Sequence, residues 1–359
     1  MNPLPLTEQA TRPRDLPLDV LRLVALFLMI SVHFARRVPG NDAWSAALRA
    51  IGETAPAFFF FAFGMTARFF MIKSAAARRQ ALLDLAVVAA LHNVFMGGLL
   101  TNDFLGFLFL CYVFIAVASL RGPVSRPVAW LVFSGLIVLY LLSPAQEVVN
   151  VSKSLVPGPF ALFPWLLFVL AGLGFAQERT ARGRRVHGAH LGMIVLALAL
   201  HVLYYATSHY GFRIQRGPVT GAYILLLVGV AGVLLLAARS AVDGLSHDES
   251  PRLEDRPLVR AVLVQPSRSL LLATVLHYPP VWLTTALMNA FIAPETLAQN
   301  ASLAILAGAA LANLGTYALL RLVLGSWTGL RESRLLRSVA RHRGAWASAT
   351  IALSALLVE

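Results

Sequence analysis

The chain has 359 residues, of which 58% are hydrophobic and 13% are charged, and its mean hydropathy is +0.72. Soluble domains carry about 25% charged residues, so this composition excludes a cytosolic enzyme, a fibrous protein and a disordered protein. The 30 Lys and Arg residues outnumber the 17 Asp and Glu residues, which gives a formal net charge of +13. Apolar runs of about 20 residues predict helices that cross a bilayer, and therefore an all-α, polytopic membrane protein.

Eleven apolar segments predict transmembrane helices. They fall at 17–35, 54–72, 80–99, 104–120, 128–143, 159–176, 188–206, 220–238, 269–292, 302–323 and 344–358. The fifth and the eleventh are short for a bilayer. The longest connection, 239–268, holds five Arg and five acidic residues and is expected to be a solvated loop.

The first apolar run does not have the pattern of a cleavable signal peptide. It contains Asp19, Arg22 and His33, and the basic pair Arg36–Arg37 follows it where small residues would be expected. The single cysteine, Cys111, lies inside an apolar run, so neither a disulfide framework nor a cysteine-based metal site is expected.

The Lys and Arg residues are distributed unevenly between alternate loops. The N-terminal tail and the loops after the even-numbered spans hold 22 of them, the other loops hold 6, and Arg22 and Arg321 fall inside spans. The positive-inside rule then predicts a cytoplasmic N-terminus and an external C-terminus. The excess positive charge is thereby explained by topology, and no nucleic-acid partner is expected. The organisation predicted is a cytoplasmic tail (1–15), a transmembrane domain (16–325), a basic cytoplasmic loop (326–343) and a final helix (344–359).

Ionisable side chains inside a bilayer are costly, so those in the first span are candidates for function. Arg22 and His33 are eleven residues apart, which at 100° per residue places them within about 20° on one helix face and about 16 Å apart along the axis. Asp19, three residues before Arg22, can pair with it. An arginine can hold the phosphates of a donor, and a histidine can act as a general base or carry an acyl group. The alternative is structural: Arg22 is an anchor paired with Asp19, and His33 is an interfacial residue.

Other polar residues within the spans extend this set. Asn313, Tyr317 and Arg321 are four residues apart and share one face of the tenth span. His277 lies in the ninth span beside Pro279 and Pro280, where prolines free backbone carbonyls. The third span contributes Asp84, His92 and Asn93, with Asp103 at its outer end. The external segment His209–Arg216 mixes aromatic and basic residues, as in a site for an anionic or glycan ligand or in an ordinary interfacial belt.

Four blocks together resemble the membrane acyltransferase-3 family. Arg14-Asp15-Leu16-Pro17-Leu18-Asp19-Val20-Leu21-Arg22 through His33 is similar to the family's opening Arg-x10-His motif. Ala57–Gly64 resembles its Phe-rich second helix, and Arg268 to Pro279, with Leu276-His277-Tyr278, resembles its late helix. Phe163-Pro164-Trp165 and Ala171–Gly174 are similar to the related heparan-α-glucosaminide N-acetyltransferase group. That group has an acyl-carrying histidine between the first two spans, and residues 36–53 contain none, which favours His33.

The resemblance implies transfer of an acyl group, by default acetyl, from cytoplasmic acyl-coenzyme A to a hydroxyl of a glycan or another small acceptor. It implies a bacterial cytoplasmic membrane and no metal. The catalytic residues implied are His33, Arg22 and Asp19. The expected coenzyme contacts are Arg22, Arg68, Arg78, Arg79 and Arg321, and the expected substrate contacts are His277, Asn313 and Tyr317. The family's Arg-x-x-Arg after the second helix is absent here.

Two other classes of function stay open. A secondary transporter or flippase would also place charges within the membrane, and inverted repeats with broken helices would favour it. The sequence shows neither feature clearly. A non-catalytic relative that acts as a sensor or assembly factor is the third possibility, and the intact Arg-x10-His spacing argues against it.

Overall fold

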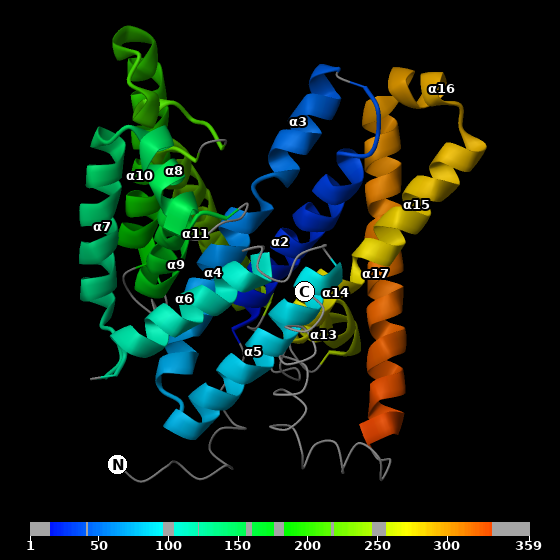
Figure 1. Cartoon of the computed structure of the whole chain (residues 1–359), viewed down its shortest axis with the longest axis horizontal. Coiled ribbons are helices and arrows are strands. Elements are labelled where there is room, and N and C mark those ends of the chain that lie inside the picture. Colours follow the sequence, from blue (N-terminus) through cyan, green and yellow to red (C-terminus); the bar gives the residue numbers. More distant parts are fainter. Residues whose placement is uncertain are drawn as a thin grey trace. The chain divides into compact units, whose positions relative to one another are not determined.

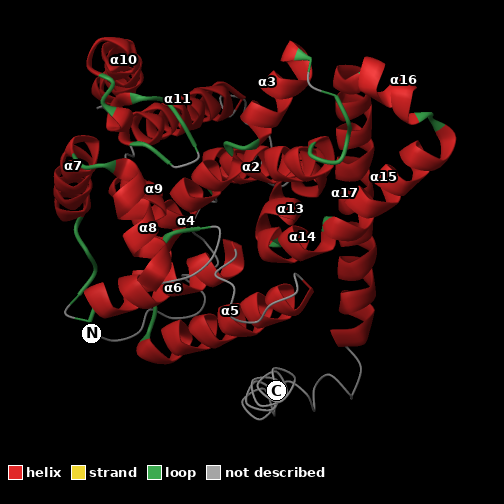
Figure 2. Ribbon diagram, turned by 45° about the horizontal axis from the view of Figure 1, so that its top comes forward, coloured by secondary structure: helices red, strands yellow, loops and turns green. Residues whose placement is uncertain are grey.

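A computed structural model of the whole chain describes residues 15–40, 42–95, 104–120, 122–155, 160–175, 183–216, 219–245 and 256–331. These residues form helices joined by turns, and Figure 2 shows no strand among them. The all-α class expected from the sequence is confirmed for this part of the chain.

Figure 1 labels the main helices. Their bounds are α2 (Leu16–Ala35), α3 (Ala43–Gly52), α4 (Ala55–Met71), α5 (Ala75–Phe95), α6 (Phe104–Ala118), α7 (Arg126–Leu142), α8 (Ala145–Leu155), α9 (Leu162–Phe175), α10 (Gly183–Thr207), η1 (Tyr210–Phe212), α11 (Gly221–Leu245), α12 (Pro257–Val259), η3 (Arg260–Val264), α13 (Gln265–Arg268), α14 (Leu270–Leu276), α15 (Tyr278–Phe291), α16 (Pro294–Gln299) and α17 (Ala301–Arg331).

Within the described residues, six helical segments are long and apolar enough to cross a membrane. They are Leu16–Ala35, Ala43–Met71, Gly188–Thr207, Gly221–Gly244, Leu270–Phe291 and Ala301–Leu324. The bent pair α7 and α8 makes a seventh if it counts as one span. The chain is therefore a multi-pass integral membrane protein. The count of eleven spans and the cytoplasmic N-terminus stay predictions from the sequence.

Helices lie at each of the first ten predicted spans, and the eleventh, 344–358, lies outside the described residues. Several helices extend beyond the apolar windows that predicted them. α17 continues to Arg331, into the predicted loop 326–343, and α12, η3 and α13 occupy part of the predicted loop 239–268. The helices α3, α8 and α16 were also predicted as loop. Hydropathy detects the part of a helix that suits a bilayer and does not detect its polar ends.

The chain divides into two compact units. The first comprises residues 1–21 and 57–259, and the second comprises residues 22–56 and 260–359. One boundary falls within α2, between Leu21 and Arg22.

In the first unit, α4 and α9 approach each other at glycines. A Cβ added at Gly64 would collide with the backbone carbonyl of Val169, and one added at Gly172 would collide with the carbonyl of Phe61. Backbone atoms cannot rotate away as a side chain can, so only glycine permits this contact. Small residues have the same role in many transmembrane helix pairs. The glycines in two of the family-like blocks are therefore packing residues.

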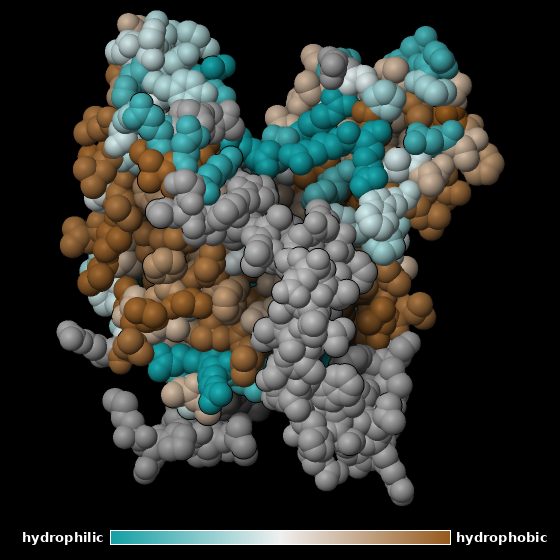
Figure 3. Space-filling view, in the orientation of Figure 1, coloured by the Kyte–Doolittle hydropathy of each residue, from teal (hydrophilic) through white to brown (hydrophobic). Residues whose placement is uncertain are grey.

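The outward surface of α7 in the first unit is apolar, as Figure 3 shows at its left edge. Leu131, Leu139 and Leu142 are all largely exposed there. Such a surface is unfavourable in water and is favourable against lipid chains. Ser125 begins the helix and a proline follows in its first turn, where a missing N–H costs nothing.

In the second unit, polar groups hold the ends of α2, α3 and α17. The guanidinium of Arg49 donates to the backbone oxygens of Ala35 (3.1 Å), the last residue of α2, and Val38 (2.9 Å), which follows it. Asp42 begins α3 and accepts from the N–H of Ser45 (2.9 Å) and the hydroxyl of Ser302 (2.7 Å). The hydrogen bond from Ser302, with that from Ser45, holds the pKa of Asp42 below its usual value. These contacts fix the chain on both sides of the α2–α3 turn.

A local break separates α14 from α15 at His277. Pro279 and Pro280 have no N–H, so they cannot donate to the carbonyl oxygens of Val275 and Leu276 in the α-helical pattern. The bonds on either side survive: His277 donates to Ala273 (3.1 Å), and Val281 donates to His277 (3.1 Å). The hydrogen-bond pattern is thus interrupted locally, within the single segment Leu270–Phe291 that is long and apolar enough to cross a membrane.

We expect Gly64→Ala to destabilise the first unit by about 1–3 kcal/mol, because the added methyl group must push apart two helix backbones. Thermal unfolding of the purified protein in detergent measures this. Gly188→Ala on α10 is the matched control, since a Cβ there meets open space and alanine favours a helix over glycine by about 1 kcal/mol. Equal stability of the two variants would contradict the close contact.

Candidate functional site

His33 and His277 lie together in the second unit. The centroids of their rings are 5.0 Å apart, with the planes tilted by 46°. Tyr278 completes the cluster, with its ring centroid 5.4 Å from that of His33 and 4.0 Å from that of His277. His33 is half-buried and His277 is only 1% exposed. The sequence predicted both histidines as site residues, and the structure makes them neighbours.

The proton on His277 is placed by a backbone contact. Its Nδ1 lies 2.8 Å from the carbonyl oxygen of Thr274, one turn earlier. A carbonyl oxygen only accepts, so Nδ1 must donate, and in the neutral ring Nε2 then holds the lone pair. This tautomer is assigned from the hydrogen bond. A buried ring with a fixed tautomer is suited to orient a neighbouring group or to accept a proton from it.

Arg22 lies nearer the beginning of α2 than His33 and contacts the same stretch of chain. Its Nη1 donates to the hydroxyl of Ser267 at 3.4 Å. From Arg22 to His33 is eleven residues, and from Ser267 to His277 is ten, so α2 and the segment 267–278 run parallel through both contacts. One face of α2 therefore presents a cation at one end of this contact and an imidazole at the other, about 16 Å away along the helix.

The residues on either side of His33 fix its position. A Cβ at Gly52 of α3 would lie 2.8 Å from the Cβ of Val32. A Cβ at Gly308 of α17 would overlap the ring of Phe34. Val32 and Phe34 are both buried. Two neighbouring helices thus approach α2 closely at these glycines, and the backbone that carries His33 is held from two sides.

The three polar residues of α17 contact different partners. Asn313 Nδ2 donates to Ala309 O (2.8 Å) and to Ser31 Oγ (3.3 Å). Ser31 and His33 are two residues apart and so point about 200° apart on α2. Asn313 therefore contacts the side of α2 that faces away from His33, and the structure does not bring these two predicted site residues together.

Tyr317 and Arg321 do contact each other, as their spacing predicts. Arg321 Nε donates to the Tyr317 hydroxyl at 3.1 Å, and its guanidinium carbon is 5.4 Å from the centre of the Tyr317 ring. The Tyr317 hydroxyl donates to the backbone oxygen of Ala261 at 2.7 Å. Tyr317 thereby links α17 to the π-helical turn η3, and Arg321 remains exposed.

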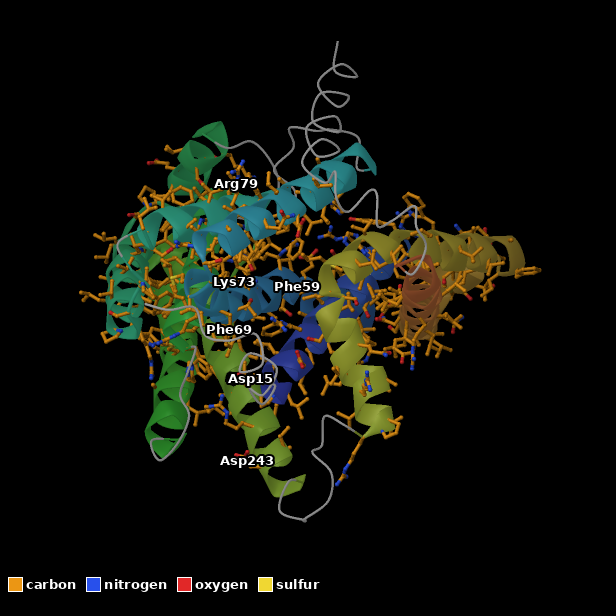
Figure 4. The ribbon with its side chains drawn as sticks, turned by 90° about the horizontal axis from the view of Figure 1, so that it is seen from below. Asp15, Phe59, Phe69, Lys73, Arg79 and Asp243 are labelled. Carbon is orange, nitrogen blue, oxygen red and sulfur yellow. The ribbon has the colours of Figure 1, made fainter. Side chains whose placement is uncertain are left out.

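The first unit holds the remaining predicted site residues. Asp19, in the first turn of α2, is 2% exposed, and its pairing with Arg22 stays a prediction. Arg68 lies in the last turn of α4, and Arg78 Nη1 donates to Ser119 Oγ at 3.1 Å. Arg79 is exposed on α5. Figure 4 labels Arg79, with Lys73 in the turn before α5, in the view from below.

Three of the other polar candidates in the first unit, Asp84, His201 and His209, have hydrogen-bond partners within that unit. Asp84 is exposed and accepts from Gln80 at 2.8 Å, and His92 is buried. The side chain of Asn93 and residue Asp103 lie outside what the structure describes.

His209 Nε2 contacts Leu141 O at 2.6 Å, and His201 Nδ1 accepts from Ile214 at 3.1 Å. These bonds tie the segment His209–Arg216 to α7 and α10, which fits an interfacial belt.

Sequence reasoning missed several residues around the histidine pair. Ser267, Thr274 and Trp282 were not expected to contribute, and Tyr278 was noted only as part of a family-like block. Arg37, one turn after His33, was counted only as a loop charge. A spacing of one helical turn would have found Trp282 from Tyr278 and Arg37 from His33. The described residues contain no group of three His, Cys, Asp or Glu side chains that can hold a metal ion.

Comparison with known proteins adds no relative. No family model, curated protein or solved structure matches the chain. The resemblance to the acyltransferase-3 family therefore rests on the sequence blocks alone.

Gly308→Ala should displace Phe34, and with it the turn of α2 that carries His33. We expect a loss of about 1–3 kcal/mol in stability, as for overpacked cores. Thermal unfolding in detergent tests this, with Gly192→Ala as the control because a Cβ there meets open space. If Gly308→Ala is as stable as the control, α17 does not hold α2 at this point.

Proposed function

We propose that the protein is an integral membrane acyltransferase that moves an acyl group, by default acetyl, from acyl-coenzyme A to a hydroxyl of a glycan or another small acceptor. The observation that carries the proposal is the pair His33 and His277. The more accessible imidazole lies beside a buried one of fixed tautomer. The same face of α2 carries Arg22 toward its other end.

His33 acts as the general base, because it is the histidine of the pair that is not fully buried. It takes the proton from the acceptor hydroxyl as the hydroxyl oxygen attacks the thioester carbonyl. The new carbon–oxygen bond forms and the carbon–sulfur bond breaks, so the acyl group becomes an ester. The coenzyme leaves as a thiolate and receives the proton from the histidine. General base catalysis of this kind contributes about 10²–10⁴-fold to a rate.

The donor binds through arginines. Arg22 and Arg321, both in the second unit, are the cations suited to the phosphates of the coenzyme, since guanidinium groups match phosphate oxygens in two-pronged contacts. Arg68, Arg78 and Arg79 remain expectations from the sequence for the same role. The resemblance of the sequence blocks supports a bacterial cytoplasmic membrane as the location.

A transporter or flippase is the second candidate. The observation that favours it is the local interruption of the main-chain hydrogen bonds at Pro279 and Pro280, since interrupted helices line the substrate sites of many secondary transporters. Purified protein mixed with acetyl-coenzyme A and an acceptor separates the two classes. Release of free coenzyme A thiol that depends on the acceptor supports transfer. Uptake of a labelled substrate into proteoliposomes without thiol release supports transport.

We expect His33→Ala to lower the rate of acyl transfer by about 10²–10⁴-fold, because the base is lost. Phe27→Ala is the control, since Phe27 is exposed on α2 and lies about 120° around the helix from His33. Thiol release measures the rate, and size-exclusion chromatography in detergent checks the fold. Full activity of a correctly folded His33→Ala protein would rule out the mechanism.

Arg22→Ala should raise the KM for acetyl-coenzyme A, by about tenfold, because a charge-assisted contact to phosphate is lost. Arg22→Lys should recover part of this effect, since lysine keeps the charge and loses the two-pronged geometry. Initial rates at varied donor concentration give the KM. An unchanged donor KM in Arg22→Ala would remove Arg22 from the donor site.

A further inference from the structure

Two contacts, one helical turn apart, join α2 and the turn that follows it to α15. His33 and Arg37 are four residues apart, as are Tyr278 and Trp282, so each pair lies on one side of its own helix or of the turn that follows it. The ring centroids of His33 and Tyr278 are 5.4 Å apart, and the guanidinium carbon of Arg37 lies 6.0 Å from the ring centre of Trp282. The ring centroids of Tyr278 and Trp282 are 6.1 Å apart. Together these four residues form a continuous strip.

Exposure increases along this strip. Tyr278 is half-buried, and Trp282 is 50% exposed. Arg37, which follows the last turn of α2, is exposed. A small molecule can therefore contact the Trp282 and Arg37 end while one of its groups extends toward His33.

Arg36 and its neighbour Arg37 differ in whether a carboxylate pairs with them. Arg36 forms an ion pair with Glu53 at 2.9 Å. Among the residues that the structure describes, no carboxylate forms an ion pair with Arg37, whose guanidinium lies over the Trp282 ring. A guanidinium held over an aromatic ring keeps its donors available for a carboxylate or phosphate.

We infer that Arg37 and Trp282 form an anion-recognising subsite for the acceptor. Binding sites of this kind combine aromatic walls with a few placed polar groups. The acceptor places an apolar ring face on Trp282 and an anionic group on Arg37, and it directs a hydroxyl to His33. One helical turn, about 6 Å, separates His33 from Arg37, which a single sugar ring can span. The acceptor class is thus a sugar that carries a carboxylate or phosphate, such as a uronic acid. The inference rests on the proposed acyl transfer.

Direct binding tests the subsite without turnover. Wild-type protein in a sugar-free, nonionic detergent, with no acyl donor and no phospholipid, is titrated by calorimetry with three probes. These are methyl β-glucoside, methyl β-glucuronoside and methyl β-glucoside 6-phosphate, which share one ring and differ at a single carbon. We expect at least one anionic probe to bind about tenfold more tightly than the neutral glucoside. The stronger of the two identifies the anion.

Three variants assign the preference. Arg37→Gln should remove the preference for the anionic probe. Arg36→Gln is the control and should keep it, because Arg36 is paired with Glu53. Trp282→Leu should weaken all three probes by a similar factor, since stacking does not depend on the charge. Equal binding of the three probes by wild type, or a preference that survives in Arg37→Gln, overturns the inference.

The outcome separates this inference from the proposed function. A charge preference that depends on Arg37, without thiol release from acetyl-coenzyme A, supports the subsite and rejects acyl transfer. Thiol release with methyl β-glucoside as acceptor, without any charge preference, supports acyl transfer and rejects the subsite.

Discussion

Close approach of helices at glycine is the constraint on which the described structure depends. Lipid chains are as apolar as leucine side chains, so helices in a bilayer gain little by exchanging lipid for one another, and tight packing holds them together instead. The first unit meets this requirement at Gly64 and Gly172. The second unit meets it at Gly52 and Gly308, where α3 and α17 approach α2. The position of His33 follows from these contacts.

Polar contacts then select one register from those that packing permits. Two contacts fix α2 against the segment 267–278, namely Arg22 with Ser267 and His33 with His277. Ser31 with Asn313 fixes the opposite side of α2 against α17. A slip of one residue would turn each of these side chains by about 100° and break all three contacts. The same residues that define the site therefore define the helix arrangement around it.

Hydropathy predicted the all-α membrane class and the helix positions well, because a run of apolar residues is enough to mark a helix that suits a bilayer. The helical period also placed Arg22 and His33 on one face, and Tyr317 beside Arg321. It did not predict which helix lies opposite each face. Asn313 looked equivalent to Tyr317 by spacing, yet its partner is Ser31. Partners are set by contacts between distant segments, and a single sequence carries no periodic signal for those contacts.

The prolines after His277 have a mechanical consequence for the second unit. Two main-chain hydrogen bonds of the α-helical pattern are missing there, so the span can flex at this joint without breaking others. His277 lies on one side of the joint, held by Thr274, and Trp282 lies on the other. The buried histidine of the proposed catalytic pair and the tryptophan of the proposed acceptor subsite thus lie on opposite sides of this joint, within one segment long enough to span a membrane.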